Sequence, residues 1–349
     1  MPSLDSTVKY GFNTSEKPHI TPSIQHPIEI STEFDRNEWD NLAGSAVNGT
    51  LFHRHRFLDY HPDGRWEHHH LAFYRKGNLV AIFPACVRME DGVRTLVSHQ
   101  GASYGGLAWS PKLQYHHLEE MVRLLTGYAQ KNGFKRIKLT PPPVIYGEYP
   151  EQPLEFSLYR GGWKVIRTEL TQAVRLDFDE NLLLDSFVNK TRTAVRKAVA
   201  NDLHYRQIIN PTQAEFDRFW EILVENRAGL GVVPTHNRAE IERLHQLVPE
   251  ALMMAAIEHE GRMIAVIWNF VCTPTTVLEF YMAHQNPYQT MRPVPLLTYH
   301  TMLWAKRAGY RWLDFGISSI WSEPTWGLLT FKENFGSRHF LRQTWQIEL

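Results

Sequence analysis

The chain carries one pattern of secondary structure twice. In each half, a β-hairpin pattern precedes a His-Gln pair, and a helix ending at a glycine follows. The matching landmarks are Gly77 and Gly261, His99 and His284, and Gly133 and Gly309, which lie 184, 185 and 176 residues apart. Three landmarks in the same order at nearly constant separation indicate a duplicated unit, although two ordinary α/β segments could match by chance.

Length and charge fit two soluble domains. A chain of 349 residues exceeds the usual size of one domain, and 43% hydrophobic residues suffice for two cores. The 37 basic residues balance the 37 acidic ones, so no overall field draws the protein to DNA or to a membrane surface. A site for a charged partner must therefore be local.

Three features favour a cytoplasmic protein. The two cysteines, Cys86 and Cys272, lie in apolar strand patterns, one in each half, and read as buried thiols in a reducing compartment. No apolar run is long enough for a membrane span, and the N-terminus lacks the core of a signal peptide. Residues 1–27, rich in Ser, Thr and Pro, are expected to form an extended or mobile arm.

Local patterns predict an α/β fold with α+β layering. Asp35 is a helix cap before an apolar stripe, residues 115–131 form an amphipathic helix, and Asp91-Gly92 is a hairpin turn. Residues 181–200 are expected to form one linking helix, and 318–327 a loop. Each half reads strand, helix, hairpin, strand, helix, strand, which predicts mixed, mostly antiparallel sheets flanked by helices.

This order of elements resembles the GNAT acyltransferase superfamily. The sequences that carry the resemblance are FYMAHQNPYQ (280–289), AGYRWLDFG (308–316), KTRTAVRKA (190–198) and GLLTFKENFG (327–336). With the duplication, they resemble the Fem-like aminoacyltransferases, which have two GNAT units, and their BioF2-like relatives. The resemblance implies a first unit over 28–160 and a linking helix with the second unit over 161–349, the C-terminal strand packing on either.

The resemblance places the central, splayed strand of the second unit at Leu278–Ala283. In GNAT enzymes, unpaired N–H groups of this strand face the donor's acyl carbonyl and stabilise the oxyanion. Coenzyme A-binding members then carry small residues in a pyrophosphate loop. Here the loop reads QTMRPV: Gln289 matches, but Arg292 and Val294 stand in place of the small residues, and prolines remove two N–H donors. This departure is usual in Fem-like proteins, whose donor is aminoacyl-tRNA. Arg292 could still meet a phosphate.

The resemblance also assigns catalytic residues. Phe331 and Lys332 match the Phe-Lys pair beside the reacting ester, where a cation would stabilise the tetrahedral intermediate; a surface lysine beside Glu333 is the alternative. No side chain is an obvious general base, and Tyr281, His284 and Glu279 all lie near the central strand.

Other candidate binding residues flank these positions. Arg192 and Arg196 share one helix face, which could grip tRNA or a nucleotide-linked acceptor or could simply be solvated. Trp321 and Trp326 could stack on a base or cover the acceptor, though packing beneath their loop explains them nearly as well. Asp314 in Asp-Phe-Gly reads as a strand end.

No metal site is predicted. His68, His69 and His70 are consecutive, and because neighbouring strand residues point to opposite faces, the three cannot bind one ion.

Three functions remain open. The first is transfer of an aminoacyl group from aminoacyl-tRNA, as a co-substrate, to a small-molecule or peptide amine, with no bound cofactor. The second is acylation of a small amine or amino sugar by acyl-coenzyme A, and the third is a non-catalytic binding module. The cleft is expected in the second unit, because the glycine-rich loop 101–106 of the first has no counterpart of Phe331-Lys332. Neither the acceptor nor the oligomeric state can be read from the sequence.

Overall fold

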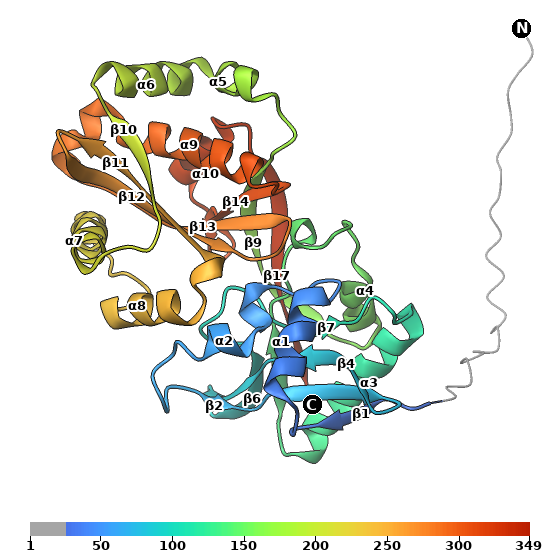
Figure 1. The fold of residues 1–349 in the computed structure, drawn as a ribbon. Helices are drawn as coiled ribbons and strands as arrows, with labels where there is room; N and C mark the ends of the chain where they lie inside the picture. The colour runs from blue at the N-terminus through green and yellow to red at the C-terminus, as the bar shows by residue number, and fades with distance from the viewer. Residues whose placement is uncertain (1–25) are drawn as a thin grey trace, which may run out of the picture.

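The computed structural model describes residues 26–349 and contains two α/β units joined by long strands (Figure 1). Elements of the first unit are β1 (Glu29–Ser31), α1 (Arg36–Ser45), α2 (His55–Leu58), β2 (Glu67–His68), β3 (Leu71–Arg75), β4 (Asn78–Phe83), β5 (Cys86–Glu90), β6 (Val93–Ser98), β7 (Ala108–Trp109), α3 (Tyr115–Lys131), β8 (Arg136–Leu139) and α4 (Pro153–Arg160). Those that follow are β9 (Lys164–Arg175), α5 (Leu183–Ser186), α6 (Asn189–Ala200), β10 (His204–Ile208), α7 (Gln213–Gly229), α8 (Arg238–Leu247), β11 (Leu252–His259), β12 (Arg262–Val271), β13 (Thr276–His284), α9 (Pro293–Arg307), β14 (Trp312–Ile317), β15 (Ser319–Ile320), β16 (Glu323–Pro324), α10 (Trp326–Glu333) and β17 (Arg338–Glu348). The predicted fold class, mixed sheets flanked by helices, is confirmed.

Helix starts follow the capping signals in the sequence. The Asp35 carboxylate accepts the N–H groups of Asn37 and Glu38 at the start of α1. At the start of α7, Thr212 and Glu215 form a reciprocal capping box. These side chains satisfy N–H groups that have no partner within the helix.

The internal repeat is present in three dimensions. Gly77 and Gly261 occupy the turns of the hairpins β3–β4 and β11–β12 with φ of 72° and 74°. Gly133 and Gly309 follow α3 and α9 with φ of 75° and 89°. In each unit a strand that precedes the helix runs parallel to the strand after it: β6 with β8 around α3, and β13 with β14 around α9. Glycine recurs at these positions because the left-handed conformation penalises a side chain.

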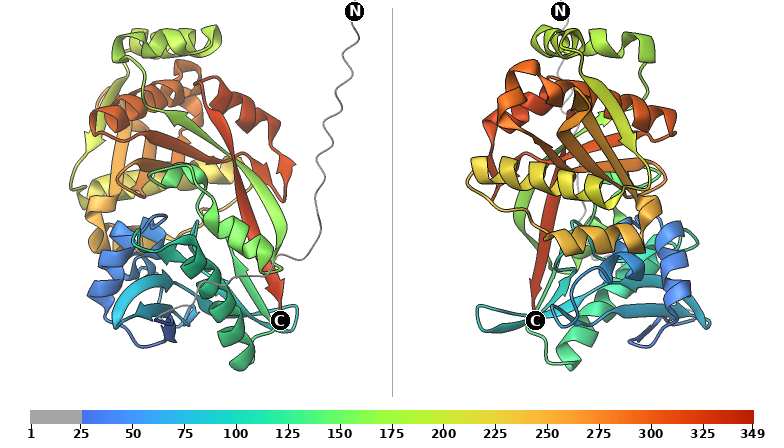
Figure 2. Two further views of the ribbon diagram at one scale, coloured as in Figure 1. Left: turned by 90° about the vertical axis from the view of Figure 1, so that its right-hand side faces the viewer. Right: turned by 60° about the vertical axis from the view of Figure 1, so that its left-hand side comes forward.

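The last strand of the chain connects the two units. One eleven-stranded sheet runs β10-β11-β12-β13-β14-β9-β17-β8-β6-β5-β2, and a four-stranded sheet, β1-β3-β4-β7, completes the first unit. β17 pairs with both β9 and β8, so the C-terminal residues complete the sheet of the first unit. The long strands β9 and β17 run side by side between the units in Figure 2. The division at residue 160 stays a prediction.

Aromatic side chains fill the junction between the units. The Phe52 ring of the first unit lies 5.9 Å from that of Phe270 in β12, and 5.7 Å from that of Tyr104. All three are buried and belong to one apolar cluster that spans both units. The units therefore share a core as well as a sheet.

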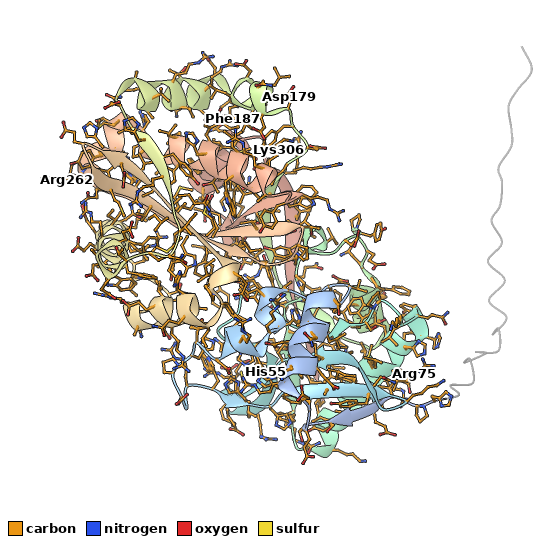
Figure 3. The ribbon with its side chains drawn as sticks, viewed as in Figure 1. His55, Arg75, Asp179, Phe187, Arg262 and Lys306 are labelled. Atoms are coloured by element: carbon orange, nitrogen blue, oxygen red, sulfur yellow. The ribbon has the colours of Figure 1, made fainter. Side chains whose placement is uncertain are left out.

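Two segments differ from the prediction. The linking helix is broken, because Phe187, labelled in Figure 3, leaves the helix between α5 and α6 and is only 3% exposed. Its ring packs against that of Phe335. The segment 318–327 is ordered as the hairpin β15–β16 followed by the first residues of α10. Both differences arise from tertiary packing.

Other predictions concern the cysteines, the membrane and the N-terminal arm. Cys86 and Cys272 are free, buried thiols, as predicted. Among residues 26–349, no helix is both long enough and apolar enough to cross a membrane. Residues 1–25 of the predicted arm lie outside the described part of the chain.

Candidate active site

A cleft opens in the second unit where two parallel strands diverge. β13 and β14 pair only from Thr276–Leu278 to Trp312–Asp314. Beyond these residues the pairing of β14 with its other neighbour, β9, shifts register, and Gly316 takes a left-handed conformation with φ of 74°. A cavity of about 610 Å³ occupies the opening and is lined by both strands. This is the splayed strand that the GNAT resemblance implied.

A β-bulge sets which side chains of β13 face the cleft. Asn269 pairs with Glu279 and Trp268 with Tyr281, so Phe280 is one residue extra. Such a bulge re-aims side chains. Glu279 lines the cavity. Tyr281 does not: it is 5% exposed, and its hydroxyl bonds to the backbone N–H and ring of His236.

Lys332 reaches the cleft from α10. Its ammonium donates to the carbonyl oxygens of Gly316 (2.7 Å) and Ile317 (2.9 Å) at the end of β14. The residue is only 4% exposed, and burial lowers the pKa of its ammonium to about 8. An ammonium has three N–H donors, so one remains free to face a substrate.

Glu279 is the second ionisable group of the cleft. Burial raises the pKa of its carboxyl to about 8, an effect that the nearby Lys332 charge opposes. Its Oε2 atom is inaccessible to solvent and has no hydrogen-bond partner. A carboxyl with a raised pKa beside a cation is a common arrangement for a general base, because its pKa lies near the working pH.

A second cavity, about 940 Å³, continues from the first toward α6 and the start of α9. The two cavities share His284, Val294 and Phe331, so they form one groove. Predicted site residues that line it are Gln289, Arg292, His284, Trp326 and Phe331. Lys332 lines the adjoining part, so six of the ten predicted positions lie along one groove.

The start of α9 is a poor cradle for a pyrophosphate. Arg292 precedes the helix in a left-handed conformation, and Pro293 is its first residue. Pro293 and Pro295 carry no N–H, so two donors of the first turn are missing. Cations line the groove here instead, from Arg292 and from Lys190 and Lys197 of α6.

The other predicted residues lie elsewhere. Arg192 and Arg196 both approach the Asp185 carboxylate, at 3.6 Å, and neither lines the groove. Trp321 lines a third cavity, of about 460 Å³, by the loop that follows β6; it adjoins the cleft at Ser103, Tyr104 and Arg342 but does not include Glu279 or Lys332. The Arg167 guanidinium lies 5.1 Å from its ring centre.

A buried carboxylate behind the cleft was not identified from the sequence. Asp314 is fully buried and accepts hydrogen bonds from the hydroxyls of Tyr146 (2.7 Å), Thr171 (2.7 Å) and Tyr104 (3.3 Å). It also accepts the N–H of Gly316 at 2.8 Å. Since Tyr104 and Tyr146 come from the first unit, Asp314 ties that unit to the floor of the cleft.

Comparison with known proteins agrees with this geometry. Residues 185–327 match the family model described as "Acetyltransferase (GNAT) domain". FemX is similar in structure, with a TM-score of 0.69 at 14% identity over 92% of this chain and 97% of FemX. No curated protein matches the chain in sequence.

Two further solved structures share the fold. A tandem GNAT protein from the clavulanic acid biosynthesis pathway has a TM-score of 0.54 at 11% identity, over 92% of this chain and 98% of that one. L-PGS from Bacillus licheniformis has a TM-score of 0.55 at 12% identity, over 91% and 93%.

The matched model assigns a GNAT domain to residues 185–327, and the diverging strands of the cleft lie within it. The chain has the Fem-like fold of two GNAT units, and its second unit carries the matched GNAT domain.

Proposed function

We propose that this protein transfers an aminoacyl group from aminoacyl-tRNA to an amine and so forms an amide. The observation that carries the proposal is that Glu279 and Lys332 line one cleft, where the charge of each affects the other, and that the adjoining groove is rich in cations. The groove lacks two of the N–H donors that a coenzyme A pyrophosphate would use, while its cations suit the phosphates at the end of a tRNA.

Each group has a part in the reaction. The Glu279 carboxylate accepts a proton from the attacking amine, whose nitrogen bonds to the ester carbonyl carbon. The free N–H of Lys332 stabilises the negative oxygen of the tetrahedral intermediate. The ester C–O bond then breaks, and the proton held by Glu279 passes to the leaving ribose oxygen.

Acyl-coenzyme A is the second candidate donor. Arg292, Lys190 and Lys197 could neutralise a pyrophosphate through side chains, although the backbone contributes little. Transfer from this donor would use Glu279 and Lys332 in the same way, with a thiolate as leaving group.

One experiment separates the donors. The full chain is incubated with a pool of charged tRNAs or with acetyl-coenzyme A, together with a mixture of amines, and donor loss and amide formation are followed. The proposal expects deacylation of tRNA coupled to amide formation, with no release of thiol. Thiol release without tRNA deacylation would show that the donor is acyl-coenzyme A and not aminoacyl-tRNA. Absence of both, in wild type and Lys332→Ala alike, would favour a non-catalytic binding module.

A further inference from the structure

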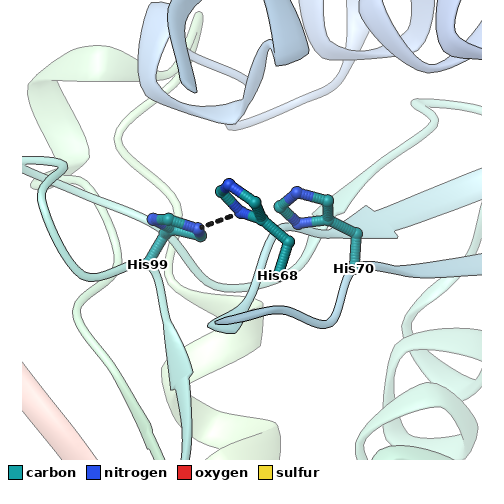
Figure 4. Close-up of side chains that lie close together, drawn as sticks. All are labelled: His68, His70 and His99. Atoms are coloured by element: carbon teal, nitrogen blue, oxygen red, sulfur yellow. Dashed lines mark hydrogen bonds between the residues drawn. The ribbon is translucent and has the colours of Figure 1, made fainter. Parts of the chain in front are cut away.

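A cluster of histidines lies in the first unit, apart from the cleft. His68 ends β2, His70 precedes β3, and His99 follows β6 (Figure 4). One ring nitrogen of each lies within 4.8 Å of the other two, and no other such group of His, Cys, Asp or Glu occurs within residues 26–349. His69 points away and bonds to the hydroxyl of Tyr128 at 2.9 Å, as strand alternation predicts.

We propose that His68, His70 and His99 bind one divalent transition-metal ion, with Zn²⁺ the best chemical match. Imidazole nitrogen suits Zn²⁺, Cu²⁺ and Ni²⁺, whereas Ca²⁺ and Mg²⁺ need oxygen ligands, which this group lacks. The prediction of no metal site considered only the three consecutive histidines. The fold instead brings His99 from 29 positions beyond His70 to the side that His68 and His70 share.

The two better placed ligands are His68 and His99. Nδ1 of His68 lies 3.3 Å from Nε2 of His99. Two nitrogens bound to a tetrahedral Zn²⁺ at about 2.0–2.1 Å are about 3.3 Å apart, so the spacing fits without movement. Nδ1 of His99 donates to the carbonyl of Gln100, which keeps the Nε2 lone pair directed at the cluster. Such an outer hydrogen bond is usual for a metal-binding histidine.

His70 is the weaker ligand. The Ala85 N–H donates to its Nδ1 at 3.0 Å, so the neutral ring carries its proton on Nε2. To bind a metal through Nε2, the ring must give up this hydrogen bond. Removal of His70 should therefore cost less metal affinity than removal of either partner.

A neighbouring histidine supplies independent support. His61 is 5% exposed, and neither of its ring nitrogens has a hydrogen-bond partner. Its ring lies 6.3 Å from that of His99. Buried polar atoms without partners are unfavourable, and a metal ion with its bound water would bring a partner to this spot.

The ion would stabilise the first unit. His99 and Gln100 begin the loop that lines the 460 Å³ cavity, while His68 and His70 lie where the chain passes from one sheet to the other. An ion bound by all three histidines would link the loop after β6 to the segment between β2 and β3. Because none of the three histidines lines the cleft of Glu279 and Lys332, and the test measures metal binding, its outcome does not depend on the proposed reaction.

The test is titration of the chelator-treated full chain with Zn²⁺ alone, followed by calorimetry and by thermal melting with and without the ion. We expect one tight ion per chain and a raised melting temperature. His68→Ala and His99→Ala should each weaken binding by more than about 100-fold, because ligands matter more than the outer partners, whose loss costs about 10–100-fold. His70→Asn, which can still accept the Ala85 N–H, should weaken it less than either.

The control is His204→Gln, an exposed histidine of the second unit beside Asp202, which should not change the tight site. His68 is exposed, so His68→Ala gives an interpretable result even if His99→Ala fails to fold. Binding that survives both His68→Ala and His99→Ala, or that falls with His204→Gln, would overturn the proposal. So would several weak sites in place of one.

Discussion

In the proposed reaction, Lys332 is the residue on which the chemistry depends most. Its two carbonyl partners hold the ammonium in place, and its burial strengthens the field that it exerts on a developing oxyanion. We expect Lys332→Met to lower saturated turnover by about 10²–10³, the usual cost of one oxyanion-stabilising donor, with little change in acceptor binding. Single-turnover kinetics and acceptor titration measure the two effects separately.

The matched control for this substitution is Lys332→Arg, which keeps the charge. Its planar fork places that charge differently, so rescue should be partial. A variant Lys332→Met that binds substrates poorly but turns over normally at saturation would make Lys332 a binding cation.

The pH profile should report Glu279 and Lys332 together. Burial raises the pKa of Glu279 to about 8 and lowers that of Lys332 to about 8, and the proposed reaction needs the carboxylate and the ammonium at once. Protonated Glu279 limits the rate at lower pH, and deprotonated Lys332 limits it at higher pH. We therefore expect a bell-shaped profile of kcat/KM centred near pH 8, whose two apparent pKa values belong to the pair.

Glu279→Gln should remove the acidic limb of that profile and lower turnover by about 10²–10⁴, the usual contribution of a general base. A Glu279→Gln enzyme that keeps both limbs and most of its rate would exclude Glu279 as the base.

The sequence identified some residues of the candidate site better than others. Lys332 and Phe331 were found through the order of motifs, and the structure places both at the groove. Glu279 was one of three candidate bases, because only the bulge at Phe280 decides whether Glu279 or Tyr281 faces the cleft. The shared face of Arg192 and Arg196 followed from helical spacing, but spacing cannot reveal that the Asp185 carboxylate lies 3.6 Å from both.

Among elements, β17 has the widest structural role. Its pairing with β8 and β9 joins both units, and Trp345 on this strand is 7% exposed in the core of the first unit. We expect Trp345→Ala to lower the free energy of unfolding by about 3–5 kcal/mol, as large aromatic truncations in cores do. Leu341→Ala on the same strand, where the side chain is 56% exposed, should change it by much less.

Urea unfolding followed by fluorescence and by circular dichroism measures both variants. Equal losses for Trp345→Ala and Leu341→Ala would show that β17 does not pack as described.

Periodicity predicted the amphipathic helix 115–131 with its observed ends, because a helix that lies on a sheet repeats its apolar face. The linking segment, residues 181–200, was harder to predict from periodicity. Its break at Phe187 depends on Phe335, nearly 150 positions away, and no local pattern encodes that contact.

For the chain as a whole, Asp314 couples the two units. Its loss in Asp314→Ala would leave the buried hydroxyls of Tyr104, Tyr146 and Thr171 without this acceptor. At about 1–3 kcal/mol for each unsatisfied group, we expect a loss of about 3 kcal/mol or more in the free energy of unfolding. Asp314→Asn, which keeps one acceptor oxygen, should lose less, and urea denaturation compares the two.

A finding that Asp314→Ala is as stable as wild type would remove Asp314 as the link between the units. The sequence alone interpreted this residue as a strand end, since its partners Tyr104 and Tyr146 belong to the first unit and lie more than 160 positions earlier.

The central claim is that acyl transfer takes place in the cleft of the second unit. The most direct measurement is saturated turnover, with the donor that proves active, for Glu279→Gln and Lys332→Met beside Arg167→Gln and Trp321→Ala, which alter the cavity by the first unit's loop. The account expects the first two variants to lose at least about 10²-fold in turnover and the second two to stay within a few-fold of wild type. The opposite pattern would place the chemistry in the cavity beside the loop that follows β6 and contradict the account.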